Sequence, residues 1–428
     1  MKKIVIIGSG LAGLSAAYHL LKNGNEKFDV TILEKDDRVG GRVHTLYVEG
    51  TYVDLGGFMI LPFYKELRHL INELGLTTSM KRFVSDTEWY QLEQNGPLIN
   101  GKNISVSKLI PLSIFRHIIL PMLEGKIDFY EPDFSLFERE TAHEFYKEHL
   151  PNAFKKSENL ASEIFEAYTY APISHIPMTL CMSVMKKLVP HGMHGMLSKC
   201  EHIEGGASLI VGALKKEVES MGGSIQIKTE VQKVGSQRIH LVSGKKIETD
   251  KIVFASLPSP SFLKNHFVHG EKISNTHFYT VIVEMEHDTN IQDKPWFVMY
   301  CSIPQNRRSP HIASIGQCSS FSNLSRKYLV LYLSIHKNDE HSYNSHMLKE
   351  ICDSELKHYF LNNKVRKVFS SRNWKHTMPI VDIDLLEEFR LKQGQRGFYF
   401  AGDYTGLPCM DIATFSGRRV AEKILSAN

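Results

Sequence analysis

Residues 3–42 read KIVIIGSGLAGLSAAYHLLKNGNEKFDVTILEKDDRVGGR, with apolar runs separated by glycines and ended by an acid. The apolar run Ile4–Ile7 is typical of a central parallel strand that is covered on both faces. The three glycines that follow are Gly8, Gly10 and Gly13. A helix is predicted over 11–21, and a second strand, 30–33, ends at Glu34. This order predicts the first βαβ unit of a doubly wound α/β sheet.

Each glycine has its own physical role in binding a dinucleotide. Gly8 permits a tight turn, Gly10 permits close approach of the backbone to a pyrophosphate, and Gly13 permits the helix to pack on the strand. The amides at the start of the helix attract phosphates. A carboxylate at Glu34 can accept hydrogen bonds from ribose hydroxyls. The stretch therefore predicts a Rossmann-type site for an adenine dinucleotide.

A Gly-Gly-Arg sequence at 40–42 follows closely after Glu34. Two glycines let a loop run close to a phosphate and ribityl chain, and Arg42 is a fixed cation beside the phosphates. This arrangement resembles the flavin-containing amine oxidoreductase superfamily, which includes monoamine and polyamine oxidases, protoporphyrinogen oxidases and carotenoid and squalene-type desaturases. The resemblance implies that the dinucleotide is FAD. A plain surface turn with a solvated arginine is the alternative.

Residues 397–425, GFYFAGDYTGLPCMDIATFSGRRVAEKIL, carry a second signature. An apolar strand leads to Gly402 and Asp403 in a turn, and a helix is predicted from about Pro408, since proline is tolerated at a first helical position. The resemblance implies that Asp403 meets the pyrophosphate and ribityl chain. It also places the helix N-terminus, around Met410, at the flavin N1 and C2 carbonyl, where its positive dipole stabilises negative charge.

The second signature departs from the family pattern at two positions. Ile412 replaces a glycine that permits close approach to the flavin ring, so we expect the ring to sit differently. Cys409 stands where monoamine oxidases place an aromatic wall of the amine-binding cage, and a small residue there is more like the desaturase and protoporphyrinogen oxidase branches. We interpret Cys409 as a packed small side chain, with a reactive thiol as the alternative. The stretch before the signature lacks the attachment cysteine of monoamine oxidases, which implies non-covalent FAD.

The resemblance implies that two internal segments also belong to the predicted site. The run 52–57, YVDLGG, reads as a strand and a glycine turn, and a simple β-turn is the alternative. A Gly-Gly turn at 205–206 precedes an amphipathic helix and a strand predicted over 224–234. Family alignment alone makes the backbone of Val231 an adenine contact. The predicted neighbours of the flavin ring are Gly56, Gly57 and Phe58.

The fold class is α/β, with a Rossmann-type FAD-binding domain assembled from discontinuous segments and an α+β substrate domain. The FAD-binding domain is predicted over 1–61, 200–261 and 385–428. The substrate-binding domain is predicted over 62–199, which is mostly helical in pattern, and 262–384, which is richer in strand signals. The helical signals include 64–74 and 157–168, and the strand signals include 278–285 and 328–335. Trp374 and Pro379 form a W…P arrangement near the end of this sheet.

Composition limits the classes of function. The chain has 428 residues, a formal charge of +4 and 42% hydrophobic residues, which is ordinary for a globular protein and gives no nucleic-acid signal. Six well-separated cysteines without a CxxC pair favour a reducing compartment, and we expect a cytoplasmic protein. Glycines interrupt the apolar N-terminus, which argues against a signal peptide. The stretch 109–123 is too short to cross a bilayer; we interpret it as a buried helix, with peripheral membrane contact as the alternative.

A sulfur- and histidine-rich stretch invites a soft-metal interpretation. Its members are His175, Met178, Cys181, Met182, Met185, His191, Met193, His194, Met196 and Cys200. Three of the methionines share one helical face, and thioethers suit an irregular apolar pocket or core. We therefore predict an apolar surface and no metal site.

The predicted function is an FAD-dependent oxidoreductase that takes a hydride from a bulky apolar small molecule to flavin N5. No second GxGxxG is present for a nicotinamide domain, so oxygen, a quinone or another protein would accept the electrons. A flavin amine oxidase and a protein with a structural flavin are the alternatives. No catalytic acid or base and no oligomeric state is predicted. The predicted cofactor-binding residues are Gly8, Gly10, Ala12, Gly13, Glu34, Lys35, Gly41, Arg42, Gly56, Gly57, Phe58, Val231, Gly402, Asp403, Met410 and Ile412.

Overall fold

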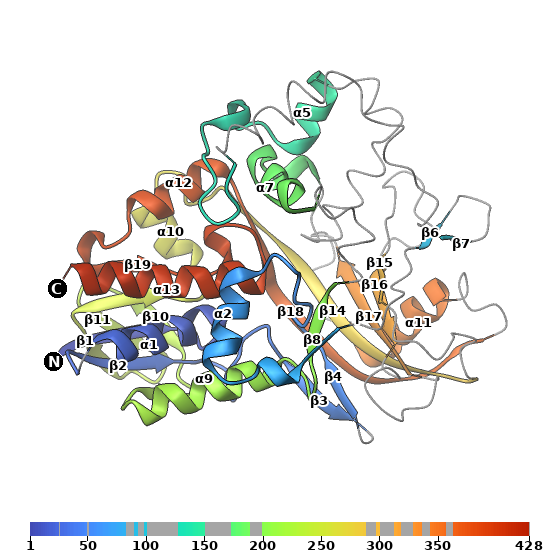
Figure 1. Ribbon diagram of the computed structural model, residues 1–428, viewed down its shortest axis with the longest axis horizontal. Helices are drawn as coiled ribbons and strands as arrows, with labels where there is room; N and C mark the ends of the chain where they lie inside the picture. The colour runs from blue at the N-terminus through green and yellow to red at the C-terminus, as the bar shows by residue number, and fades with distance from the viewer. Residues whose placement is uncertain are drawn as a thin grey trace.

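Two five-stranded sheets organise the part of the chain that the computed structural model describes (Figure 1). The described residues are 1–24, 26–48, 51–82, 90–92, 98–100, 127–149, 173–188, 199–287, 297–299, 312–317, 328–335, 343–356 and 363–427. One sheet is parallel and the other is antiparallel. A short antiparallel hairpin lies between them in contact with both halves.

The parallel sheet has the strand order β19-β13-β1-β2-β9. Its strands are β1 (Lys2–Ile7), β2 (Phe28–Leu33), β9 (Ser224–Gln226), β13 (Lys251–Phe254) and β19 (Phe398–Phe400). Ile4, Ile6 and Ile32 in the central strands are fully buried, as expected for a sheet covered on both faces. The sheet confirms the predicted Rossmann-type α/β fold. Its strands come from three regions far apart in the sequence.

Helix α1 (Leu11–Gly24) packs against α9 (Ser208–Ser220) and α13 (Met410–Ser426). The contact with α13 is close, because a Cβ at Gly417 would lie 2.3 Å from the carbonyl oxygen of Ala12. Ser15 Oγ donates a hydrogen bond of 3.0 Å to the carbonyl of Thr414 across the same interface. The C-terminal helix is thereby packed on the first helix of the chain, as Figure 1 shows in red and blue.

The antiparallel sheet has the order β15-β16-β17-β14-β18. Its strands are β14 (Ile273–Met285), β15 (Phe297–Met299), β16 (Ile312–Gln317), β17 (Tyr328–Ile335) and β18 (Val365–Val381). Strands β14 and β17 confirm the strand predictions at 278–285 and 328–335. Odd-numbered residues of β14 such as Val281 pack toward α11 (Ser345–Leu356), and Ile282 packs on the opposite face.

Smaller elements complete the described structure. The remaining strands are β3 (Thr45–Val48), β4 (Thr51–Asp54), β5 (Met80–Arg82), β6 (Tyr90–Leu92), β7 (Leu98–Asn100), β8 (Glu201–Ile203), β10 (Val231–Val234), β11 (Arg238–Leu241) and β12 (Lys246–Glu248). The remaining α-helices are α2 (Lys65–Glu73), α5 (Ala142–His149), α7 (Met178–Leu188), α10 (Pro260–His266) and α12 (Ile383–Leu391). The short 3-10 helices are η1 (Thr77–Ser79), η5 (Leu136–Arg139), η6 (Ile173–His175), η9 (Gln395–Gly397) and η10 (Asp403–Thr405).

The structure corrects two of the expected boundaries. The strand predicted over 224–234 is two strands: β9 joins the parallel sheet, and β10 pairs with β11 in a separate antiparallel sheet. Between them Lys228 has a φ of +52°, which ends the extended conformation. The C-terminal helix begins at Met410 instead of near Pro408, because Cys409 has an extended backbone and serves as its N-cap.

Only some of the other predicted segments lie within the described residues. The helix predicted over 64–74 is α2. The segments 109–123 and 157–168 lie outside the described residues. Among the helices of the described ranges, not one combines the length and hydrophobicity that a bilayer crossing requires. The domain boundaries proposed from the sequence stay a prediction.

Candidate functional site

The glycine turn after β1 lies at the carboxyl edge of the parallel sheet. Gly8 has a φ of +104°, and its amide donates a 2.8 Å hydrogen bond to the carbonyl of Leu33 at the end of β2. A Cβ at Gly13 would lie 2.0 Å from the carbonyl oxygen of Gly8, so α1 can approach the turn only with glycine there. At Gly10 no atom lies within 4 Å of the position of a Cβ, which leaves space beside the start of α1.

Glu34 closes β2 and faces the glycine turn. Its carboxylate is 7% exposed. One carboxylate oxygen, Oε2, accepts hydrogen bonds from the amide and hydroxyl of Ser9 at 2.9 and 2.6 Å, and Oε1 accepts one of 2.9 Å from the amide of Asp36. A carboxylate offers about four lone-pair sites, so one is left for a further donor. Ser9 was not identified from the sequence, where it is the variable residue between two glycines, and Lys35 is exposed.

The loop at 40–42 packs directly on the glycine turn. Gly40 forms a parallel bridge with Gly10, and its amide donates a 2.9 Å hydrogen bond to the carbonyl of Ser9. A Cβ at Gly41 would lie 3.2 Å from Cα of Gly10. Arg38, which sequence reasoning missed, donates to the carbonyls of Val39, Gly41 and Val43 and so holds this loop. Its guanidinium also lies over the ring of Trp374, 5.9 Å from the centroid.

Arg42 joins the N-terminal loop to the C-terminal signature. Its Nη2 lies 2.5 Å from Oδ1 of Asp403, a buried carboxylate 361 residues away in the chain. Asp403 begins the short helix η10, and the amide of Gly402 before it donates a 2.8 Å hydrogen bond to Oγ of Ser416 in α13. The predicted phosphate-side residues Gly41, Arg42, Gly402 and Asp403 are therefore brought together.

The turn after β4 lies against both the Arg42 loop and the start of α13. The amide of Gly57 donates a 3.0 Å hydrogen bond to the carbonyl of Arg42, and a Cβ at Gly56 would lie 1.7 Å from that same oxygen. A Cβ at Gly57 would lie 3.0 Å from Cγ of Met410 at the start of α13. Phe58 stacks on Tyr332 of the antiparallel sheet, with ring centroids 6.0 Å apart. Three sequence segments thus meet around Arg42, Gly57 and Met410.

Cys409 and Ile412 have structural partners at the start of α13. Sγ of Cys409 accepts a hydrogen bond of 3.4 Å from the amide of Ile412, which caps the helix. Ile412 is only 2% exposed, and a Cβ at Gly406 would lie 3.2 Å from its Cγ2. A side chain that is already covered by protein faces the core instead of an open cavity.

Asp411 points away from the Gly57 turn and toward α2. Its Oδ1 accepts a 2.7 Å hydrogen bond from the amide of Leu67, and its Oδ2 accepts one of 2.7 Å from the hydroxyl of Tyr130. Burial raises the pKa of the Asp411 carboxyl to about 6. The same contacts raise the pKa of the Tyr130 hydroxyl, first through burial and then through the charge of Asp411. The motif acid is therefore a cap for a neighbouring helix.

Val231 begins β10, next to the loop that carries Glu34. The amide of Thr229 donates a 2.7 Å hydrogen bond to the carbonyl of Glu34, and the amide of Lys228 donates one of 2.9 Å to the carbonyl of Asp36. These bonds place the segment before Val231 beside the acid that was predicted to bind ribose. The structure brings Val231 to the expected end of the site, and its contact with adenine stays a prediction.

These residues fit a dinucleotide of the FAD type. Open space at Gly10 adjoins the start of α1, and the first turn of that helix carries no acidic residue to oppose a phosphate. Arg42 supplies a cation, and the Glu34 carboxylate keeps a lone-pair site for a hydroxyl. The three segments also provide the close backbone approaches that only glycine allows.

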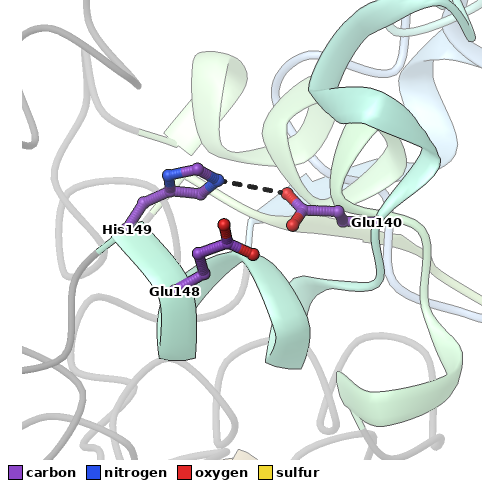
Figure 2. Close-up of side chains that lie close together, drawn as sticks. All are labelled: Glu140, Glu148 and His149. Atoms are coloured by element: carbon purple, nitrogen blue, oxygen red, sulfur yellow. Dashed lines mark ion pairs between the residues drawn. The ribbon is translucent and has the colours of Figure 1, made fainter.

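One group of potential metal ligands occurs in the described ranges, away from the glycine turns. Glu148 and His149 at the end of α5 and Glu140, which follows η5, place one ligand atom each within 4.8 Å of one another (Figure 2). Nε2 of His149 lies 3.4 Å from Oε2 of Glu140. Exposed acidic side chains often lie this close together without an ion, so we assign no metal to this group.

The methionines predicted to line an apolar pocket lie in α7. Met178 and Met182 are fully buried and Met185 is partly buried, all within the main hydrophobic core of the described chain. Burial raises the pKa of the Cys181 thiol beside them, as expected for an unreactive cysteine. The other members of the sulfur- and histidine-rich stretch between residues 189 and 198 lie outside the described residues.

Comparison with known proteins supports the same interpretation. A model of the family described as flavin containing amine oxidoreductase matches residues 11–425. An L-amino-acid oxidase of Pseudechis australis is 36% identical over 127 residues, which are 29% of this chain and 23% of that protein. The aligned segment thus spans less than a quarter of the length of that relative. The family match confirms the predictions of the family and of FAD as its cofactor; non-covalent attachment stays a prediction.

Solved structures share the fold over the whole chain. A CLA-producing fatty acid isomerase from P. acnes superimposes with a TM-score of 0.75 at 15% identity, covering 99% of this chain and 98% of the other. A protein from Exiguobacterium sp. 255-15 described as a protoporphyrinogen oxidase gives a TM-score of 0.73 at 19% identity, covering 100% of this chain and 99% of the other. At such identities the likeness establishes the fold.

Proposed function

Because the chain belongs to the flavin-containing amine oxidoreductase family, we propose that it is an FAD-dependent oxidoreductase that removes a hydride from a carbon of a small-molecule substrate. The observation that carries the proposal is the convergence of two N-terminal loops with the C-terminal signature around Arg42, Gly57 and Met410. Gly56 and the ion pair of Arg42 with Asp403 hold these segments close together.

The roles of the chain's own residues follow from their chemistry. Glu34 would hold the ribose, while Arg42 and the start of α1 would hold the diphosphate. The N-terminus of α13, at Met410, favours an electron-rich group beside it because its dipole is positive there. A bound flavin supplies the two-electron acceptor for the hydride.

For the substrate we propose a bulky apolar molecule of isoprenoid or tetrapyrrole type. Cys409 at the N-cap of α13 leaves more room than an aromatic side chain would at that position. Of the three methionines of α7 named above, Met178 and Met182 are buried in the core, and the partly buried Met185 would supply an adaptable thioether to an apolar lining. Oxygen, a quinone or another protein would then accept the electrons.

Oxidation of an amine is the second candidate. It is favoured by the segment that is 36% identical to the L-amino-acid oxidase of Pseudechis australis. A protein with a purely structural flavin is a weaker candidate, because Ile412, which motivated it, is covered by protein.

The test is the visible absorbance of the purified protein, followed by anaerobic mixing with isoprenoids, porphyrinogens, amines and L-amino acids. We expect flavin absorbance that is bleached by one of the apolar classes. Bleaching by amines or amino acids, with peroxide released in air, would establish the second candidate instead. A purified protein that neither contains FAD nor binds added FAD would reject the proposal.

A further inference from the structure

The turn Gly56–Phe58, which is predicted to lie at the flavin ring, packs against the antiparallel sheet. Three side chains of that sheet contact it or the residues just before it. Thr280 lies on β14, Tyr332 on β17 and Trp374 on β18, which are adjacent strands. Thr280 pairs in register with Tyr332, and Phe278, two residues earlier on β14, pairs with Trp374. All three side chains are buried. We call them the Leu55 clamp, after the residue whose carbonyl accepts hydrogen bonds from Thr280 and Trp374.

The hydrogen bonds that the Leu55 clamp donates to the turn are accepted by backbone carbonyls. Nε1 of Trp374 donates a hydrogen bond of 3.1 Å to the carbonyl of Leu55 and one of 3.0 Å to Oγ1 of Thr280. The hydroxyl of Thr280 donates to the same Leu55 carbonyl. The hydroxyl of Tyr332 donates a hydrogen bond of 3.0 Å to the carbonyl of Asp54. Two consecutive carbonyls at the end of β4 are therefore satisfied by one sheet.

The same sheet also contacts the turn through its rings. A Cβ at Gly56 would lie 3.5 Å from Cζ2 of Trp374, and Phe58 stacks on Tyr332 with an interplanar angle of 21°. On the other side, the amide of Leu55 donates a 2.7 Å hydrogen bond to the carbonyl of His44. The turn is thus confined between the Leu55 clamp and the Arg42 loop, and its distance from Met410 depends on both.

We propose that Thr280, Tyr332 and Trp374 are positioning residues that set the place of Gly56–Phe58 against the N-terminus of α13, and thereby the environment of the flavin ring. The proposal rests on the proposed function, because it assumes that the ring lies at this turn. These residues of the antiparallel sheet would affect the cofactor through the turn, without touching the cofactor themselves. Loss of one clamp hydrogen bond lets Leu55 shift and loosens the turn.

The main variant is Thr280→Val, which keeps the shape of the side chain and removes its hydroxyl. Thr280→Ser keeps the hydroxyl and serves as the rescue variant. Tyr332→Phe removes one hydrogen bond, keeps the ring that stacks on Phe58, and provides a second test if Thr280→Val does not fold. The matched control is Thr249→Val, because Thr249 is also buried and its hydroxyl also contacts backbone carbonyls, those of Lys3 and Lys251, at the opposite edge of the parallel sheet.

The measurements are the Kd for FAD and the reduction potential of the bound flavin. We expect Thr280→Val and Tyr332→Phe to raise the Kd by about fivefold, the effect of one lost buried hydrogen bond, and to shift the potential. Thr280→Ser should retain the values of the unaltered protein. Thr249→Val should lower the melting temperature without changing either quantity.

Two outcomes would count against the proposal in different ways. If the unaltered protein binds FAD while Thr280→Val and Tyr332→Phe bind it with the same Kd and potential, the Leu55 clamp is only structural and the proposed function survives. If the unaltered protein binds no FAD, the proposed function fails and this proposal fails with it.

Discussion

Gly10 and Gly13 lie in one turn, and the structure gives them different tasks. A Cβ at residue 13 would collide with the carbonyl of Gly8 at 2.0 Å, whereas a Cβ at residue 10 would meet no atom within 4 Å. Gly13 serves the packing of α1 on β1, as its position in the sequence predicted. The open space at Gly10 is compatible with the predicted approach of a pyrophosphate, which stays a prediction.

The contrast predicts opposite effects for two alanine substitutions. Gly13→Ala should lower the free energy of unfolding of the FAD-free protein by about 1–3 kcal/mol, because α1 must move away from the turn. Gly10→Ala should change it by less than about 0.5 kcal/mol and yet raise the Kd for FAD at least about tenfold, since its methyl group enters the open space. Urea unfolding and FAD titration measure the two effects. Equal losses of stability in both variants would contradict the assignment.

Arg38 illustrates a site residue that no motif reveals. Arg38→Lys should destabilise the protein by about 1–3 kcal/mol and weaken FAD binding, because an ammonium cannot donate to the carbonyls of Val39, Gly41 and Val43 as the planar guanidinium does. The control is Arg238→Lys in an exposed ion pair with Glu248, which should cost less than about 0.5 kcal/mol. Thermal unfolding with and without FAD compares the variants; equal small effects would refute a special role for Arg38.

At the scale of elements, two helices begin without a capping side chain of their own. The N-cap residues of α2 and α9 are Tyr64 and Ala207, and neither makes a side-chain cap hydrogen bond. Asp411 of α13 supplies an acceptor to α2, and Asp54 of β4 accepts from the amide of Ala207 at 3.0 Å. The sequence predicted α2 from its periodicity, but its cap lies 344 residues away, so local pattern could not reveal it.

These buried caps predict a dependence of stability on pH. The pKa of Asp411 is about 6 in the folded protein against a usual value of 3.8, because burial disfavours the charged form. Between about pH 4 and pH 6 the Asp411 carboxyl is therefore ionised in the unfolded chain and still protonated in the folded protein. The free energy of unfolding falls as the pH rises through this range. Asp411→Asn keeps an acceptor for the amide of Leu67 and should remove this fall, which is on the order of 3 kcal/mol.

The measurement is the free energy of unfolding across pH 4 to 7 for both proteins, pH values that bracket the shifted pKa. Asp54→Asn should act in the same direction, because burial also raises the pKa of Asp54 to about 6. Parallel pH profiles for the variant and the unaltered protein would show that Asp411 carries no such proton linkage.

At the scale of the whole molecule, the candidate site exists only when two N-terminal loops and the distant C-terminal signature are folded together. The ion pair of Arg42 with Asp403 and the contact of Gly57 with Met410 each join residues that are separated by most of the length of the chain. A ligand that touches all three parts should therefore stabilise the fold as a unit.

FAD should raise the melting temperature with the logarithm of its concentration once that exceeds the Kd, with a stabilisation of about 2.7 kcal/mol at a hundred times its Kd. FMN is the control, because it lacks the adenosine half that Glu34 and the segment before Val231 would hold. Differential scanning fluorimetry compares the two, and we expect a much smaller shift with FMN. An equal shift with FMN would mean that the adenosine half contributes no binding energy.

The glycine spacing of residues 8–13 and the acid Glu34 were sufficient to predict the α/β fold, because they arise from local backbone geometry. The resemblance of the two later signatures to a known family supplied the family and its cofactor. The helix caps at Asp411 and Asp54 and the Leu55 clamp depend instead on side chains that reach backbone groups far away in the chain. Such contacts leave no periodic or spaced pattern, since any residue with the right donor or acceptor could make them. They follow only from how the two sheets pack around the turn at Gly57.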